Sequence, residues 1–168
     1  MNRVTASIGS IIFLLLAPGV FAGVIPWWFS QWRVKPSALD VTWLKIVGAA
    51  LVAFGLLLLL DSFARFALQG VGTPAPVLPT RHLVVSGAYR HVRNPIYVAV
   101  VALILGQGFL FAREGLLLYG AIIWLAFHLF VVAYEEPALR STFGAEYDRF
   151  AANVPRWLPR IRPWTPPN

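Results

Sequence analysis

The stretch that decides the fold is IYVAVVALILGQGFLFAREGLLLYGAIIWLAFHLFVVAY, residues 96–134. It contains two apolar runs separated by a short turn at residues 113–115. The two charged side chains of the stretch, Arg113 and Glu114, lie in this turn. Each run comes close to the roughly 20 residues that an α-helix needs to cross a bilayer. Asn94 suits the N-cap and Pro95 the first helical position. Residues 94–134 are therefore predicted to form an antiparallel hairpin of two transmembrane helices.

The composition favours a membrane protein over a soluble one. Of the 168 residues, 58% are hydrophobic and 12% are charged, whereas soluble domains average about 45–50% apolar residues. The absence of cysteine excludes disulfides, thiolate catalysis and cysteine-based metal sites, and we assign no metal ligands. The net charge is +7, but the cations lie in short segments between apolar runs. This distribution favours lipid headgroups over nucleic acid as the partner.

Two further spans are expected before the hairpin, in an N-terminal membrane part formed by residues 1–69. The first covers about residues 5–29, and we expect it to be retained as a span, although a cleaved signal peptide is the alternative. Pro18 and Pro26 could kink or split it. The second covers about residues 42–68.

Several polar or small residues within the spans are better explained by packing than by chemistry. Asp61 and Arg65 are spaced i, i+4 and are expected to form an interfacial ion pair. Gly106 and Gly108 are expected to allow close helix packing. For His128 we expect a hydrogen bond within the packed helices.

The region after the first two spans, residues 70–168, contains a loop at 70–93, the hairpin, and an amphipathic helix with a tail at 135–168. Apolar residues recur in that last segment at spacings of 4, 4 and 3: Leu139, Phe143, Tyr147 and Phe150. This pattern predicts a helix on the cytoplasmic membrane surface that begins at Pro137. Trp157 and Trp164 are expected to anchor the tail at the interface.

The distribution of cations predicts the topology. With four spans, ten of the 14 Lys and Arg residues fall on the side of the termini and of the 70–93 loop. Because cytoplasmic segments are enriched in cations, this side is predicted to be cytoplasmic. The basic cluster Arg90, His91 and Arg93 then lies on the same face as Glu135 and Glu136.

The carboxylate pair Glu135-Glu136 is unusual at the end of an apolar helix. A negative charge near a helix C-terminus meets the unfavourable end of the helix dipole, and adjacent like charges repel. A cationic partner is therefore expected among the basic cluster or at Arg140, unless a cationic ligand takes this place. The pair could also belong to an interfacial salt-bridge cluster that only fixes the hairpin.

The combination of motifs resembles the isoprenylcysteine carboxyl methyltransferase family, which is related to the phospholipid N-methyltransferases. The resemblance covers residues 81–160. The matching positions are Arg93-Asn94-Pro95-Ile96-Tyr97, the apolar hairpin, Glu135-Glu136, Leu139, Phe143-Gly144, Tyr147, Phe150 and Val154-Pro155. Two positions depart from the family pattern: Asn94 stands where a histidine is usual, and Phe150 where a tyrosine is usual.

The resemblance implies that residues 70–168 bind S-adenosylmethionine as a methyl donor. The candidate cofactor-binding residues are Arg90, His91, Asn94, Pro95, Tyr97, Glu135, Glu136 and Tyr147, and the candidate catalytic residues are Arg140 and Arg156. A glutamate could bind the ammonium or ribose of the donor, and an arginine its carboxylate. A tyrosine could supply a hydroxyl group or stack on the adenine.

The sequence thus predicts an all-α, polytopic membrane protein with about four transmembrane helices and a cytoplasmic active site. It would methylate a carboxylate, amine or thiol on a lipid-like or small hydrophobic acceptor that arrives laterally from the bilayer. The alternative is a non-catalytic membrane protein, such as a transport subunit or a lipid-binding scaffold. In that case the charged cluster would serve only topology and packing.

Overall fold

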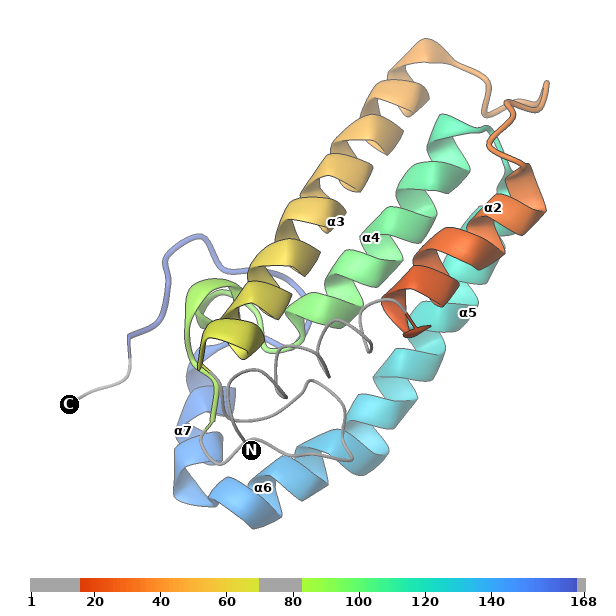
Figure 1. The fold of residues 1–168 in the computed structure, drawn as a ribbon. Coiled ribbons are helices and arrows are strands. Elements are labelled where there is room, and N and C mark those ends of the chain that lie inside the picture. The colour runs from red at the N-terminus through yellow and green to blue at the C-terminus, as the bar shows by residue number, and fades with distance from the viewer. Residues whose placement is uncertain (1–15, 70–82, 166–168) are drawn as a thin grey trace. The chain divides into compact units, whose positions relative to one another are not determined.

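The computed structural model describes residues 16–69 and 83–165, and all regular secondary structure in these ranges is helical (Figure 1). The elements are the π-helical turn η1 (Val20–Val24), α2 (Ile25–Ser30), α3 (Thr42–Gln69), the 3-10 helix η2 (Gly87–Arg90), α4 (Pro95–Leu110), α5 (Glu114–Phe130), the π-helical turn η3 (Val131–Glu135), α6 (Glu136–Phe143) and α7 (Ala145–Asn153). The predicted all-α class is confirmed for these residues. The expectations for residues 5–15 and 70–82 lie outside the described residues.

Two helical segments are long and apolar enough to cross a membrane. They cover Thr42–Arg65, with 24 residues, and Glu114–Phe143, with 30 residues. The other two apolar helices, Val20–Ser30 and Pro95–Leu110, are shorter. At 1.5 Å per residue α4 rises about 24 Å, less than the roughly 30 Å of a hydrocarbon core. Of the four predicted spans, the described residues therefore contain two of full length.

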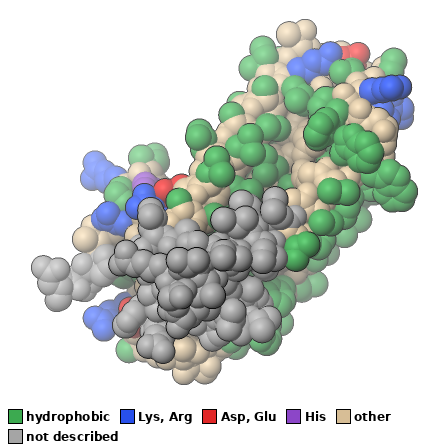
Figure 2. Space-filling view, viewed as in Figure 1, with side chains coloured by type: hydrophobic (Ala, Val, Ile, Leu, Met, Phe, Trp, Pro, Cys, Tyr) green, Lys and Arg blue, Asp and Glu red, His purple; other side chains and the backbone are tan. Residues whose placement is uncertain are grey.

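The long helices expose apolar faces. Large hydrophobic side chains lie at the surface of α3 and α5, including Trp43, Ile46, Leu57, Leu118 and Ile122. Figure 2 shows many hydrophobic side chains at the surface of the face that it draws. Such extended apolar surface is typical of proteins that contact lipid.

The helices divide into two units, and one of them contains Leu14–Leu59 and Ile96–Phe127. Within this unit α3 and α4 approach each other at glycines. A Cβ atom on Gly106 would lie 2.8 Å from the Gly48 carbonyl oxygen and 2.9 Å from the Val52 amide nitrogen. Because backbone atoms cannot move aside as a side chain can, only glycine allows this spacing. The predicted packing function of Gly106 is confirmed.

Replacing Gly106 by alanine is expected to destabilise the protein, whereas the same replacement at Gly115 is not. A Cβ on Gly115 would meet nothing within 4 Å, so helix propensity alone should give Gly115→Ala about 0.5–1 kcal/mol of stability. Forcing a methyl group against the backbone typically costs about 1–3 kcal/mol. Thermal unfolding in detergent micelles measures both variants. Equal shifts of the two midpoints would contradict the close approach of α3 and α4.

Proline shapes the first apolar segment of this unit through a π-helical turn. Pro26 has no N–H, so the Ala22 carbonyl four residues earlier loses its helical partner. The turn is closed instead by the Ile25 N–H, which donates to the Val20 carbonyl oxygen. Gln107 on α4 donates from Nε2 to the Ala22 carbonyl at 2.7 Å. The buried amide of Gln107 thus satisfies a carbonyl that the proline leaves unpaired.

The described residues of the other unit lie within Leu60–Pro95 and His128–Asn168. Its core is formed by Tyr147, Phe150 and Val154, with Leu139 and Phe143 packed against them. The predicted apolar stripe is therefore a single cluster, but its position at a membrane surface stays a prediction.

The stripe is distributed over two helices rather than one. The helix does not begin at Pro137 as predicted, because α5, η3 and α6 follow one another without interruption to Phe143. The break comes at Gly144, whose φ of 50° favours glycine. Trp164, predicted as an interfacial anchor, packs on Phe150 with the ring centroids 6.0 Å apart.

Candidate functional site

The carboxylate that the sequence placed at a helix end lies inside a continuous helix. Pro137 cannot donate a backbone hydrogen bond, and the preceding turn is widened into the π form, in which the Glu136 N–H donates to the Val131 carbonyl oxygen five residues back. Because Glu136 lies inside this continuous helix and not at its C-terminus, the predicted unfavourable dipole does not apply. The two glutamates also differ, because Glu136 is buried and Glu135 only partly so.

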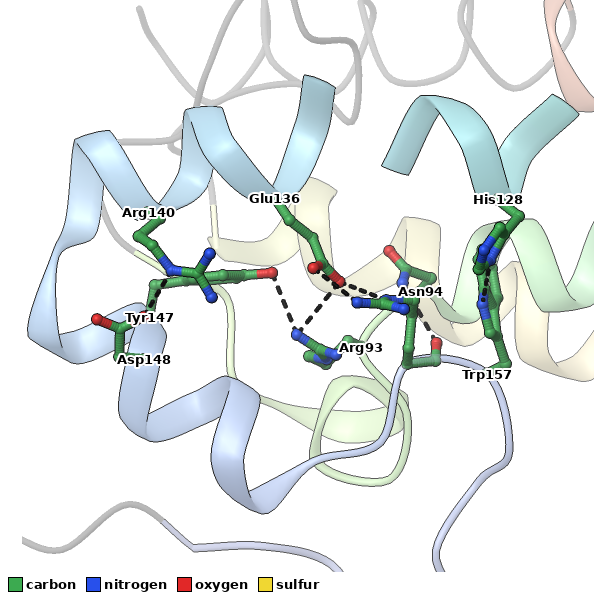
Figure 3. Close-up of polar contacts among 9 residues, drawn as sticks. Arg93, Asn94, His128, Glu136, Arg140, Tyr147, Asp148 and Trp157 are labelled. Atoms are coloured by element: carbon green, nitrogen blue, oxygen red, sulfur yellow. Dashed lines mark hydrogen bonds and ion pairs between the residues drawn. The ribbon is translucent and has the colours of Figure 1, made fainter. Parts of the chain in front are cut away.

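Two arginines neutralise Glu136 (Figure 3). Arg156 binds it with both arms, Nε to Oε1 at 2.6 Å and Nη2 to Oε2 at 2.9 Å. Arg93 Nη1 lies 3.3 Å from the same Oε1. The cationic partner predicted for the carboxylate pair is thus Arg93, from the basic cluster, together with Arg156, which that prediction did not include.

Arg93 is the central residue of this arrangement. Its side chain is 11% exposed, and its Nη1 also donates to the Tyr147 hydroxyl at 3.3 Å. Its Nε is buried and has no hydrogen-bond partner among the described residues. An unpaired buried N–H of a charged group is costly, so a ligand acceptor at this atom would be favourable. With Arg156 and Glu136 the cluster carries one excess positive charge.

Tyr147 and Arg156, the two residues that flank Glu136 in this cluster, keep their charge states near neutral pH. Burial raises the pKa of the Tyr147 phenol, and the nearby Glu136 carboxylate raises it further. The hydrogen bonds that the Arg156 guanidinium donates to Glu136 raise its pKa. A neutral phenol and a permanent cation therefore flank the carboxylate, an arrangement suited to binding a charged ligand.

The C-terminal tail is tied across the basic cluster by backbone hydrogen bonds. The Arg93 N–H donates to the Pro155 carbonyl oxygen, and the N–H groups of Arg160 and Trp164 donate to the carbonyl oxygens of His91 and Arg90, all at 2.9 Å. These contacts bring Arg156, 63 positions after Arg93 in the sequence, into the site.

Side chains of the predicted site residues also hold the tail. Arg90 donates from Nε to the Trp164 carbonyl oxygen at 2.7 Å, and His91 Nδ1 lies 2.8 Å from the Arg160 carbonyl oxygen. Buried Asn94 donates from Nδ2 to the Arg156 carbonyl oxygen at 3.2 Å. Arg90, His91 and Asn94 therefore position the segment of the tail that carries Arg156.

The remaining predicted residues, Arg140, Pro95 and Tyr97, are described by contacts with other groups than Glu136. Arg140 is exposed, pairs with Asp148 at 2.7 Å, and lies 5.8 Å from the centre of the Tyr147 ring. Pro95 is buried at the start of α4. Tyr97 belongs to the other unit, where its ring lies 4.6 Å from that of Phe127.

Two features were missed in the residue assignments. Arg93 was recognised as part of the basic cluster but not assigned to the site, although its place directly before Asn94 was a usable signal. The second is the bond from Trp157 Nε1 to His128 Nδ1 at 3.1 Å. It confirms the hydrogen bond expected for His128, and it assigns Trp157 a contact that no local pattern indicates.

The segment before Arg93 is held by the ion pair predicted at the end of the second span. Arg65 donates to Asp61 Oδ1 from Nε at 3.1 Å and from Nη2 at 3.0 Å, so the pair is confirmed. Asp61 Oδ2 in turn accepts the Ala88 N–H at 3.0 Å. Gly87, with φ of 53°, allows this approach, since a Cβ there would collide with both side chains. Asp61 thus also fixes η2, which leads to Arg93.

Comparison with known proteins identifies one family. A model of the phospholipid methyltransferases matches residues 43–146, more than half of the chain. The matched region includes Arg93, Asn94 and Glu136, whereas Tyr147 and Arg156 follow it. No curated protein and no solved structure matches the chain. The match confirms the group of membrane methyltransferases that the sequence motifs indicated.

Proposed function

The chain belongs to the phospholipid methyltransferase family, and we propose that it transfers a methyl group from S-adenosylmethionine to a lipid-like or small hydrophobic acceptor. The observation that carries this proposal is the cluster of Arg93, Glu136, Tyr147 and Arg156, in which Glu136 and Tyr147 are buried and Arg156 is partly exposed. A cluster that served topology alone would not need a buried guanidinium N–H without a partner.

The residues of the cluster fit the amino-acid end of the donor. Its carboxylate requires N–H donors and positive charge, which the Arg93 Nε and the excess charge of the cluster supply. Its ammonium requires a carboxylate, for which Glu135 and Glu136 are the candidates. When bound, the donor supplies an electrophilic methyl group on a sulfonium.

The chain would contribute alignment rather than acid–base chemistry. Fixing two reacting groups in line can lower a barrier by roughly 7–11 kcal/mol. In this proposal Arg156 keeps Glu136 ionised and oriented. Arg140, which the motif resemblance suggested as catalytic, provides positive charge beside the Tyr147 ring, 5.8 Å from its centre.

The acceptor is proposed to reach the site laterally, because the long apolar helices expose their faces to lipid. Its methylated group would be a carboxylate, an amine or a thiol. The excess of cations near the site further supports a multi-pass arrangement with the site on the cytoplasmic face.

Calorimetric titration of detergent-purified protein with S-adenosylmethionine tests the donor. Saturable binding is expected for the unchanged chain and for Glu146→Gln, an exposed carboxylate on α7 that serves as the control. Lack of saturable binding by the unchanged chain would rule the proposal out. Radiolabelled methyl transfer into membrane extracts, with separation of lipid, protein and volatile products, then identifies the acceptor. Donor binding without any transfer would favour the non-catalytic alternative.

Replacing Asn94 by histidine is expected to preserve donor binding, whereas aspartate is expected to weaken it. Asn94 donates to the Arg156 carbonyl oxygen, and a histidine ring N–H can do the same. This explains why either residue suits the position. Aspartate would turn an acceptor toward that carbonyl, and an unsatisfied buried group costs about 1–3 kcal/mol. Donor titration of both variants measures the difference. An equal loss in the two would show that the hydrogen bond to Arg156 is not what the position requires.

A further inference from the structure

The most exposed large hydrophobic side chains among the described residues lie in the C-terminal tail. Ile161 is 95% exposed and Leu158 is 81% exposed. They follow α7 in a segment without regular secondary structure, three positions apart. Single exposed hydrophobic side chains are common, but apolar side chains grouped together and rimmed by polar residues mark sites of contact with membranes or other partners.

The segment around these side chains is held at both ends. Trp157, directly before Leu158, donates from Nε1 to His128 on α5, at 3.1 Å. The backbone N–H groups of Arg160 and Trp164 donate to the chain at His91 and Arg90. Leu158 and Ile161 therefore project from a constrained loop, not from a loose end.

The contact with α5 places this loop beside the apolar part of a long helix. His128 lies seven positions before Glu135, the first carboxylate after the apolar run. At 1.5 Å per residue this is about 10 Å along the helix axis toward its apolar middle. Trp157, the residue directly before Leu158, therefore contacts this helix at His128, within its apolar run.

The charges of the tail fit a phospholipid surface. Residues 154–165 contain Arg156, Arg160 and Arg162 and no Asp or Glu. Arg156 is engaged with Glu136, and Arg160 donates from Nη1 to the Asn153 carbonyl oxygen at 2.6 Å. Arg160 and Arg162 flank the exposed Ile161 in the sequence. Alternation of cationic and apolar side chains is typical of segments that lie in the interface of an anionic membrane.

We propose that residues 157–163, the tail loop, dock on the surface of an anionic phospholipid bilayer. Leu158 and Ile161 enter the boundary between headgroups and acyl chains, and Arg160 and Arg162 contact the phosphates. This docking does not depend on the proposed methyl transfer. Because the same tail carries Arg156, docking on the bilayer also helps to hold Arg156 in the candidate site.

The absence of cysteine in the chain allows a direct test. Full-length Ile161→Cys, labelled with a polarity-sensitive fluorophore, is placed in nanodiscs of phosphatidylcholine with or without phosphatidylglycerol. We expect a blue-shifted emission that nitroxide-labelled lipids quench, and stronger quenching when phosphatidylglycerol is present. Arg162→Gln in the same background should lower the docked fraction in anionic nanodiscs, since one cation near such a surface changes partitioning roughly fivefold.

Two labelled positions provide the reference signals. Ile122→Cys on α5 reports a lipid-facing site and Glu146→Cys on α7 a water-facing one, since both side chains are exposed. Emission from position 161 that matches Glu146→Cys in every nanodisc would overturn the proposal. Quenching that is equal with and without phosphatidylglycerol would overturn the assignment of anionic headgroups. Neither measurement requires the methyl donor, so failure of docking and failure of donor binding are separate results.

Discussion

Glu136→Gln is expected to lower both the stability of the protein and its affinity for the donor. The substitution leaves Arg93 and Arg156 beside each other without the carboxylate that neutralises them. Removing one partner of a buried ion pair costs about 3–5 kcal/mol. Because the Arg156 side chain is 32% exposed, we expect the low end of this range. The repelling arginines should also separate, so donor affinity should fall by at least about tenfold, or 1.4 kcal/mol.

Thermal unfolding in detergent measures the loss of stability, with Glu135→Gln as the matched control, and donor titration measures the loss of affinity. The two glutamates are adjacent and identical in chemistry, but Glu136 is buried and contacts both arginines, whereas Glu135 is only partly buried. Glu135→Gln should therefore change stability less. If both variants unfolded at the same temperature, the distinction between the two carboxylates would be wrong.

Arg93→Lys is expected to separate donor binding from folding. A lysine keeps a positive charge near Glu136, so stability should change less than in Glu136→Gln. It lacks the planar fork and the buried Nε that is unpaired among the described residues. Hydrogen bonds to charged groups contribute about 1.5–3 kcal/mol, which predicts a loss of roughly 10-fold to 100-fold in donor affinity.

Arg149→Lys, on the exposed surface of α7, controls for the chemistry of the substitution. It should bind the donor as the unchanged chain does. Unchanged affinity in Arg93→Lys, with the unfolding temperature also preserved, would mean that the Arg93 guanidinium is not the carboxylate-binding group.

The parts of the structure that the sequence predicted depend on local patterns. The apolar runs of residues 96–134 determine the hairpin, because hydrophobic length and a short charged turn suffice to define two helices. The i, i+4 spacing of Asp61 and Arg65 determines their ion pair in the same way. Neither prediction needs knowledge of distant contacts.

The parts that were not predicted depend on distant contacts or on competing local rules. Arg156 reaches Glu136 because the tail pairs with residues 90–93, and no periodicity in either segment indicates that pairing. Pro137 was expected to begin a new helix, since proline favours the first turn. The structure uses a π turn to accommodate it instead, and the helix continues to Phe143. The π turn also changes the direction in which Glu135 and Glu136 point, and the sequence alone therefore does not predict which of the two is buried.

The π-helical turn η3 has a consequence for the genetics of the site. A regular α-helix advances about 100° per residue, and a π turn contains one residue more than the α turn it replaces. Deleting the codon for Ala133 would therefore convert the π turn into an ordinary α turn and leave the flanking helices at about the same angle to each other. Point mutations at exposed positions of the span, such as Val132, leave the orientation of Glu136 unchanged. The π turn thus carries one extra residue without turning Glu136 away from Arg93 and Arg156.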